Sequence, residues 1–305
     1  MQPKLTVVIP AYNYAETIER AVYSVLDQLT DEVELIVVND GSTDNTKNIL
    51  DRIKQKQGNR ISVFYQSNCG AASARNLGCL KAHGEYFIFL DADDELASGA
   101  LHSILSFIKN HPTVGFIIGG HQSVLPNNIA KNHIPKPLPL SAYDRVRRYL
   151  IDKKISLSNG ACVMHRSIFE HIQYPEHFRN SEDIPVFTYV LANCECAVLP
   201  NILARIHKHD DSLRHHLAYT ESVGAQLIDE VFNPLHLPSD ILNLKRHYAA
   251  QRYLSLSRVA YDSKDYRKCR RYFLSAFLIK WRVIFKLPYT KKMIKSLYKI
   301  TLREK

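Results

Sequence analysis

Short apolar runs alternate with amphipathic stretches over the first 120 residues of this 305-residue chain. The runs are rich in β-branched and aromatic residues and have the length of buried strands. They lie at 5–9, 34–38, 61–65, 86–90 and 115–118. Between them, apolar residues recur at helical spacing, which predicts helices over 15–29, 44–56, 70–83 and 98–110. This alternation predicts an α/β fold with a mainly parallel sheet covered by helices.

The pattern changes after residue 120. Residues 121–141 contain four prolines and little periodicity, and we expect a long loop there, over the site. A helix over 142–151 and strands over 157–165 and 197–206 follow. From residue 217 on the sequence is helical in character. A helical hairpin is expected over 249–261 and 266–277.

Polar residues follow the ends of the predicted strands. The clearest case is 86–94, where five apolar residues lead directly into Asp91, Asp93 and Asp94. Ligands of open α/β sheets bind just beyond the carboxyl ends of the strands. Carboxylates there can hold Mg²⁺ or Mn²⁺ together with substrate phosphates. An acidic turn without a ligand is the alternative. The three spaced glycines of a dinucleotide site are absent after the first strand, which disfavours an NAD enzyme.

The net charge of +10 is placed unevenly along the chain. From Asp265 to the end there are thirteen Lys and Arg against two acids, a net of +11, so the rest carries −1. This disfavours general nucleic-acid binding and favours a local anionic partner. Because apolar residues are interspersed with these cations, the tail could lie on an anionic membrane surface. A helix packed on the protein with a solvated basic face is the alternative.

The pattern of cysteines and the first residues of the chain predict in which cellular compartment the protein lies. The six cysteines are scattered without a Cys-x-x-Cys pair, and we interpret them as reduced thiols. The chain enters a strand pattern at once, without the pattern of a signal peptide. We therefore expect a cytoplasmic protein, which the basic tail could place on the inner face of the cytoplasmic membrane.

Four segments in register resemble family 2 of the glycosyltransferases, enzymes with a GT-A fold that use nucleotide-diphospho-sugars. They are 8–13 (VIPAYN), 37–44 (VVNDGSTD), 68–78 (NCGAASARNLG) and 84–94 (GEYFIFLDADD). A fifth match is the Glu-Asp pair at 182–183. The resemblance is strong over 4–120, fair to about 215 and poor beyond. It implies a nucleotide-sugar-binding half over 1–120, an acceptor-binding half over 121–215 and a basic helical region over 216–305.

The resemblance also implies an activity. It is the inverting transfer of a sugar from a UDP- or dTDP-type donor to a hydroxyl of a glycan or lipid-linked acceptor. Lipopolysaccharide, O-antigen or capsule synthesis is the expected setting, and Mn²⁺ or Mg²⁺ is the expected cofactor.

For the nucleotide, Asp40 could accept the N3–H of a uracil or thymine ring, or it could cap the next helix. Pro10 and Tyr12 would shape the base pocket and stack on the base, although Tyr12 could equally be simple packing. Arg75 lies among small residues, where a guanidinium can reach a diphosphate. Asn76 beside it is expected to be structural.

For the metal, Asp91 would meet the ribose or the cation, Ala92 lies with it in the nucleotide site, and Asp93 would hold the cation through the diphosphate. His207 would complete the metal site, with His209 competing for that role.

Inverting transfer also needs a base for the acceptor hydroxyl. Asp183 is the expected base, with Glu182 contacting the acceptor or orienting the loop. The alternative is an acid-rich helix N-terminus with Ser181 as its cap. Residues 158–160 would shape the acceptor site, or form a turn.

Two other classes of function remain open. A nucleotidyltransferase also combines a nucleotide pocket with a metal, but it normally has a glycine-rich basic loop after the first strand, which residues 10–14 do not supply. A non-catalytic basic protein that binds membrane or nucleic acid through a degenerate transferase domain is the other. The intact acids at positions 40, 91, 93 and 183 argue against degeneracy.

Overall fold

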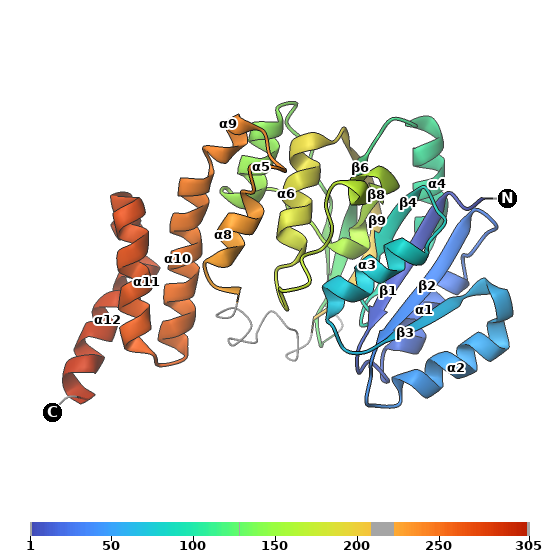
Figure 1. Cartoon of the computed structure of the whole chain (residues 1–305), viewed down its shortest axis with the longest axis horizontal. Helices are drawn as coiled ribbons and strands as arrows, with labels where there is room; N and C mark the ends of the chain where they lie inside the picture. Colours follow the sequence, from blue (N-terminus) through green and yellow to red (C-terminus); the bar gives the residue numbers. More distant parts are fainter. Residues whose placement is uncertain (1, 128, 209–222, 304–305) are drawn as a thin grey trace.

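A computed structural model of the chain describes residues 2–127, 129–208 and 223–303. Its described part holds one nine-stranded sheet, with helices on both faces and a helical arm at the C-terminal end (Figure 1). The strand order is β3-β2-β1-β4-β8-β6-β9-β5, and β7 pairs with β6 outside this path. The predicted α/β class is confirmed.

The first half follows the predicted alternation, with small shifts at the ends of the elements. Its strands are β1 (Leu5–Ala11), β2 (Val33–Asp40), β3 (Ser62–Gln66) and β4 (Tyr86–Phe89). Its helices are α1 (Ile18–Leu26), α2 (Thr46–Gln57), α3 (Ala71–Lys81) and α4 (Ala100–Asn110). A short 3₁₀ turn, η1 (Gly58–Arg60), follows α2. The four strands are parallel, so their carboxyl ends meet at one edge of the sheet.

Alternate residues of these strands serve two different cores. Val8 and Phe87 face the core that contains α5 and α6, whereas Val7 and Ile88 face the core under α1, α2 and α4. Because both faces of β1, β2 and β4 are buried, these strands are mostly apolar, whereas β3 at the edge of the sheet is only partly buried. Helix α3 packs closely on β1, since a Cβ at Gly78 would lie 2.3 Å from Val8 Cγ1.

The second half makes the sheet mixed. It contains β5 (Glu95–Leu96), β6 (Phe116–Val124), β7 (Ala130–His133), β8 (Cys162–His165), β9 (Cys196–His207), α5 (Ala142–Leu150) and α6 (Asp183–Asn193), with 3₁₀ turns η2 (Asn159–Ala161) and η3 (Arg166–Glu170). Strand β8 pairs antiparallel with β4 and β6, while β9 runs parallel to β6.

Two sequence-based boundaries in this half are wrong. The long loop predicted over 121–141 contains the end of β6 and all of β7, which form an antiparallel pair. Residues 121–123 are polar and therefore gave no strand signal; backbone pairing with β7 and β9 holds them in the sheet. The strand predicted over 157–165 begins only at Cys162, after η2.

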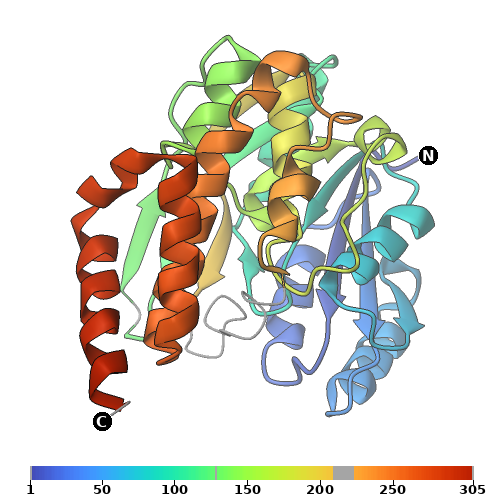
Figure 2. The same ribbon diagram turned by 60° about the vertical axis from the view of Figure 1, so that its left-hand side comes forward.

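The C-terminal region is helical, as expected. It comprises α8 (Gln226–Val231), α9 (Ser239–Leu242), α10 (Lys245–Asp262), α11 (Tyr266–Ile279), η5 (Trp281–Phe285) and α12 (Leu287–Arg303). The predicted hairpin is α10–α11, and α12 packs beside it, on the side of the molecule away from α2 (Figures 1 and 2). Tyr248 of α10 shares a core with Phe187 of α6, so this region is joined to the sheet by continuous packing. None of the described helices is both long and apolar enough to span a bilayer.

Candidate active site

The acidic turn lies at the carboxyl end of β4. The backbone N–H of Asp94 donates to the carbonyl of Asp91 at 3.0 Å, which closes the turn. Helix α1 holds it from one side: the Thr17 hydroxyl donates to the carbonyl of Ala92 at 2.9 Å, and the Arg20 guanidinium donates to the carbonyl of Asp93. Ala92 itself is 1% exposed, so it packs under the turn. Backbone groups fix the turn, and the Asp91 side chain remains 37% exposed.

The carboxylates of the turn are close enough to influence one another. Asp94 is buried and accepts a hydrogen bond from the backbone N–H of His207 at 2.9 Å. Burial raises the pKa of Asp94 to about 8, and the charges of Asp91 and Asp93 add to that rise. A nearby cation would relieve this repulsion. The chemistry of the turn therefore fits a hard divalent cation.

His207 ends β9 beside the turn, but its ring has another partner. Its Nε2 lies 2.6 Å from Glu95 Oε1, and Glu95 also faces Arg20 and Arg205. In the described ranges no group of three or more His, Cys, Asp or Glu side chains is arranged to hold a metal ion. Mg²⁺ sites usually need only one or two carboxylates, because substrate phosphates supply further ligands. The ligand roles of Asp91, Asp93 and His207 stay predictions, and His209 lies outside the described residues.

Arg75 connects the two halves of the site. Its Nη2 donates to Asp91 Oδ1 at 2.9 Å and its Nη1 donates to Glu182 Oε1 at 2.6 Å. The guanidinium is also 5.3 Å from the centre of the Tyr174 ring, and the residue is only 4% exposed. Burial works against its charge, but Asp91 and Glu182 outweigh that effect and raise the pKa of Arg75. The guanidinium thus faces two carboxylates, and its expected contact with a diphosphate stays a prediction.

Glu182 and Asp183 stand at the start of α6. Ser181 before them has φ +67°, a left-handed conformation that is unfavourable for a residue with a Cβ. The cap position of α6 is Glu182, so the alternative in which Ser181 caps an acid-rich helix N-terminus is wrong about the cap. Burial raises the pKa of the Tyr149 hydroxyl well above its ordinary value, and the nearby Asp183 charge adds to it. The helix start therefore brings Glu182 to Arg75 and places Asp183 beside a buried aromatic cluster.

The expected nucleotide residues lie at the ends of β1 and β2. Pro10 is buried within β1, whereas Tyr12 just beyond it is 41% exposed. Asp40 is 2% exposed, and its carboxylate accepts from the Gln66 side chain and from the backbone N–H groups of residues 69 and 70 at 2.7–2.8 Å. Its alternative role as a helix cap is wrong, because α2 begins after Asn45. Pairing with a pyrimidine base stays a prediction.

Asn13 joins the loops that follow β1 and β2. It adopts φ +59°, and its side-chain oxygen accepts from the backbone N–H groups of Thr43 at 2.8 Å and Asp44 at 3.3 Å. In return, the backbone N–H of Asn13 donates to the Ser42 hydroxyl at 3.0 Å. We call these mutual bonds the Asn13 latch. The latch therefore joins the two loops that carry the expected nucleotide residues Tyr12 and Asp40.

Tyr174 was not identified from the sequence, and nothing in its local pattern marks it. The residue is 1% exposed, and its hydroxyl donates to Asn159 Oδ1 at 3.1 Å. The Asn76 side chain binds the backbone of Tyr174 twice. It accepts a hydrogen bond from the Tyr174 N–H at 3.0 Å and donates one to the Tyr174 carbonyl at 2.9 Å. The structural role expected of Asn76 is therefore confirmed. Asn159, within the segment expected to shape the acceptor site, instead supports the ring that lies against Arg75.

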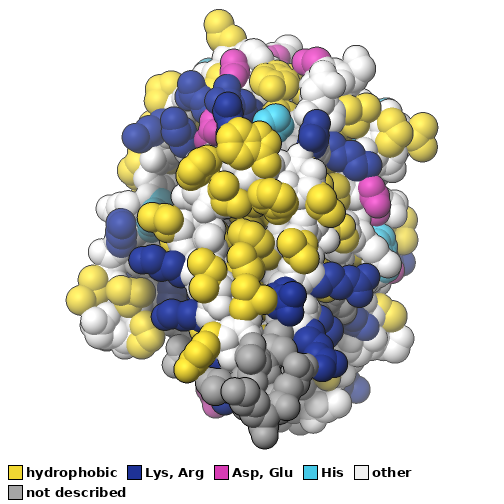
Figure 3. Space-filling view, turned by 90° about the vertical axis from the view of Figure 1, so that its left-hand side faces the viewer, with side chains coloured by type: hydrophobic (Ala, Val, Ile, Leu, Met, Phe, Trp, Pro, Cys, Tyr) yellow, Lys and Arg dark blue, Asp and Glu magenta, His cyan; other side chains and the backbone are white. Residues whose placement is uncertain are grey.

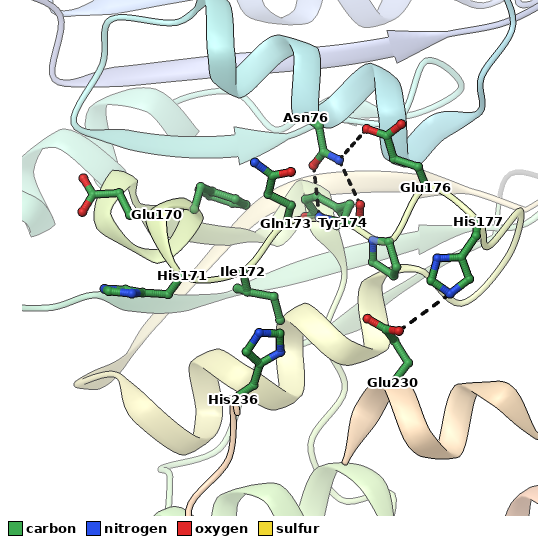
Figure 4. A pocket seen from close by; sticks show the side chains of 12 residues that line it. Asn76, Glu170, His171, Ile172, Gln173, Tyr174, Glu176, His177, Glu230 and His236 are labelled. Atoms are coloured by element: carbon green, nitrogen blue, oxygen red, sulfur yellow. Dashed lines mark hydrogen bonds and ion pairs between the residues drawn. The ribbon is translucent and has the colours of Figure 1, made fainter. Parts of the chain in front are cut away.

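A polar groove of about 510 Å³ opens beside Tyr174 (Figure 4). Its lining includes Asn76, Gln173, His177 and Glu230, with His177 Nε2 3.7 Å from Glu230 Oε2. The acidic turn and the start of α6 do not line it. The groove and the carboxylate site are therefore separate features.

The α/β fold thus places Asp91, at the end of the central strand β4, across Arg75 from Glu182 at the start of α6. The model of the family described as "Glycosyl transferase family 2" matches residues 6–173. The chain belongs to this family.

Curated relatives and solved structures agree with this assignment. The chain is 30% identical over 182 residues to the Campylobacter jejuni GalNAc(5)-diNAcBac-PP-undecaprenol beta-1,3-glucosyltransferase, covering 59% of this chain and 57% of that protein. It is 43% identical over 108 residues to the Bacillus subtilis putative teichuronic acid biosynthesis glycosyltransferase TuaG, covering 35% and 42%. The chain thus spans less than two thirds of the length of these relatives.

Among solved structures, Staphylococcus aureus TarS 1-349 in complex with UDP-GlcNAc has a TM-score of 0.69 at 21% identity, over 96% of this chain and 89% of that one. The Pyrobaculum calidifontis mannosyltransferase PcManGT in complex with GDP-Man and Mn²⁺ has a TM-score of 0.57 at 18% identity, over 98% and 86%. The expected GT-A fold is confirmed.

Proposed function

We propose that this chain is an inverting glycosyltransferase that moves a sugar from a UDP- or dTDP-type donor to a hydroxyl of a glycan or lipid-linked acceptor. The observation that carries the proposal is the Arg75 bridge. It holds the acidic turn after β4 and the start of α6 at one centre, so groups suited to the donor diphosphate lie across from groups suited to the acceptor.

The donor side needs positive charge and a shaped floor. When bound, Mn²⁺ or Mg²⁺ would sit at Asp91 and Asp93, with His207 as the nearby candidate ligand, and would neutralise charge on the departing diphosphate. Tyr12 offers an exposed ring for the base, above a floor that the Asn13 latch holds in place. Asp40 fixes the adjoining loop with three hydrogen bonds, and its Oδ2 keeps one acceptor position for a pyrimidine N3–H.

The acceptor side needs a base. In the proposed step, the acceptor oxygen forms a bond to the anomeric carbon while the bond from that carbon to the diphosphate breaks. The proton of the acceptor hydroxyl passes to the Asp183 carboxylate. Glu182 keeps the start of α6 in place through Arg75, so we assign it a positioning role. A positioned base typically contributes about 10²–10⁴-fold to the rate.

Two relatives support a proposal on the acceptor class and the setting. The Campylobacter relative is named for an undecaprenol-linked acceptor and the Bacillus relative for teichuronic acid. We therefore propose a role in cell-surface glycan synthesis at the cytoplasmic face of the membrane.

A screen of nucleotide-sugars for hydrolysis, with Mn²⁺ and Mg²⁺, tests the donor. We expect turnover of a UDP- or dTDP-sugar and a rise in unfolding temperature with UDP plus Mn²⁺. Formation of a nucleotide-sugar from a nucleoside triphosphate and a sugar phosphate would indicate a nucleotidyltransferase instead. No response to any nucleotide would indicate a non-catalytic protein.

Asp183→Asn tests the base. We expect this variant to keep the nucleotide affinity of the wild type while transfer falls by about 10²–10⁴-fold. If nucleotide binding and transfer were lost together, the assignment of Asp183 would be wrong.

A further inference from the structure

The outer face of α11, η5 and α12 carries an apolar stripe that no other part of the described chain covers. On α11, the residues Phe273 and Ala276 face α10 and are buried. A second stripe on the same helix begins at Leu274 and Leu278 and continues through Trp281 and Phe285 of η5. Leu274 and Leu278 are four residues apart and therefore lie on one side of α11. Trp281 and Phe285 follow in η5, after the extended backbone of Lys280.

These side chains are strongly exposed. Leu278 is 80% exposed, Trp281 56% and Phe285 69%, and the Trp281 and Phe285 rings lie 6.0 Å apart. The neighbouring α12 adds Leu287, Ile294 and Tyr298 at 61%, 56% and 69%. Single exposed apolar side chains are ordinary, but a contiguous group of this kind marks an interaction surface.

Cations flank the stripe. Between Tyr266 and Arg303 the sequence contains twelve Lys and Arg and no Asp or Glu. Figure 3 shows hydrophobic side chains along the middle of this face, with Lys and Arg on both flanks. The Cζ atom of Arg282 lies 5.4 Å from the centre of the Trp281 ring, so a cation is stacked on one of the exposed aromatic rings. We call this surface the basic apolar face.

The apolar side chains, cations and aromatic rings of the basic apolar face together indicate what kind of partner binds it. A second copy docked by the same face would bring two strongly positive surfaces together, which is unfavourable. An anionic bilayer suits each kind of side chain on this face. Its phosphates attract Lys and Arg, and its interface favours Trp and Tyr. Its acyl region is a favourable environment for Leu and Phe.

We propose that the basic apolar face docks this protein on an anionic membrane surface, with Trp281 and Phe285 entering the interface. This proposal rests on the proposed function only for the reason why the protein would need to reach a membrane. The docking surface itself is argued from the exposure and charge of its residues. A lipid-linked acceptor would then meet the enzyme at the bilayer surface.

Sedimentation of the full-length protein with vesicles tests the proposal. The vesicles are phosphatidylcholine alone, or equal parts of phosphatidylcholine and phosphatidylglycerol. We expect binding to the mixed vesicles at low salt, little binding to phosphatidylcholine, and weaker binding as salt rises. Lys280→Gln with Lys286→Gln should lower the partition coefficient about 25-fold, at about fivefold for each cation. Trp281→Ser with Phe285→Ser should lower it at least about tenfold.

Matched controls change equally exposed residues elsewhere. Lys109→Gln with Lys131→Gln removes two cations from α4 and β7, and Leu140→Ser removes a side chain that is 98% exposed. Both controls should bind vesicles like the wild type. The unfolding midpoint of each variant shows whether it is folded.

Equal vesicle binding by the Trp281/Phe285 variant and the wild type would overturn the proposal. So would a wild-type dimer that the same substitutions convert to a monomer, since a second copy would then be the occupant. Nucleotide-sugar hydrolysis without vesicles is measured in parallel and should not change in these variants. Loss of vesicle binding with hydrolysis intact supports the docking face. Wild-type vesicle binding without hydrolysis of any donor would refute the proposed function and leave the docking face standing.

Discussion

Replacing Arg75 by Met should destabilise the protein mainly through Glu182. The guanidinium is 4% exposed and pairs with a Glu182 side chain that is 13% exposed and an Asp91 side chain that is 37% exposed. Removing one partner of a buried ion pair costs about 3–5 kcal/mol, because the other charge stays buried without compensation. Water can reach Asp91 when Arg75 is gone, so the loss of the Asp91 pair contributes little to the fall in the free energy of unfolding. We therefore expect a loss of about 3 kcal/mol, at the lower end of that range.

A double-mutant cycle separates the two arms of the bridge. Urea unfolding would be measured for Arg75→Met, Glu182→Gln, Asp91→Asn and the two doubles that contain Arg75→Met. The coupling free energy between Arg75 and Glu182 should be about 2 kcal/mol, and that between Arg75 and Asp91 below about 1 kcal/mol. An Asp91 coupling as large as that of Glu182, or an unchanged stability of Arg75→Met, would refute the reasoning, because it would mean that burial does not set the strength of the bridge.

Three further outcomes are expected. Mn²⁺ alone should raise the unfolding temperature little, whereas Mn²⁺ with UDP should raise it by more than the sum of the separate shifts, because the described residues contain no preformed cluster of three metal ligands; a full shift with Mn²⁺ alone would contradict this. Gly78→Ala should lower the free energy of unfolding by about 1–3 kcal/mol, since its Cβ would meet Val8. Leu80→Ala on the same helix, at 77% exposure, should change it by less than about 0.5 kcal/mol in urea unfolding. Tyr12→Ala should weaken UDP binding by about tenfold in calorimetry if its ring stacks on the base, and an unchanged affinity would assign the ring to packing.

The strands that position the acidic turn could be predicted because their burial has a simple sequence signature. Residues 86–90 are apolar on both faces, which only a central strand requires, and the acids begin where burial ends. The same rule failed at 121–123 and at β7, where polar residues lie in the sheet. Backbone pairing holds these residues, and it leaves no periodic pattern in the sequence.

The meeting of Arg75 with Glu182 could not be predicted from spacing, since 107 positions separate them. The sequence placed Arg75 within the helix predicted over 70–83 and Glu182 beside the expected base, but only the tertiary fold shows that the two share a hydrogen bond. Tyr174 is a sharper case. Its ring lies 5.3 Å from the Arg75 guanidinium. Hydrogen bonds to Asn76 and Asn159, which are 98 and 15 positions away in the chain, hold Tyr174 in this place.

The Asn13 latch has a consequence for how the substrate preference of such a protein can change. The loops after β1 and β2 hold each other through hydrogen bonds between side chains and backbone N–H groups, and these bonds need no ligand. Exposed side chains on this support, such as Tyr12, can be exchanged without rebuilding it. If the proposed base pocket lies here, its preference can change by single substitutions, whereas a change at Asn13 would disturb both loops at once.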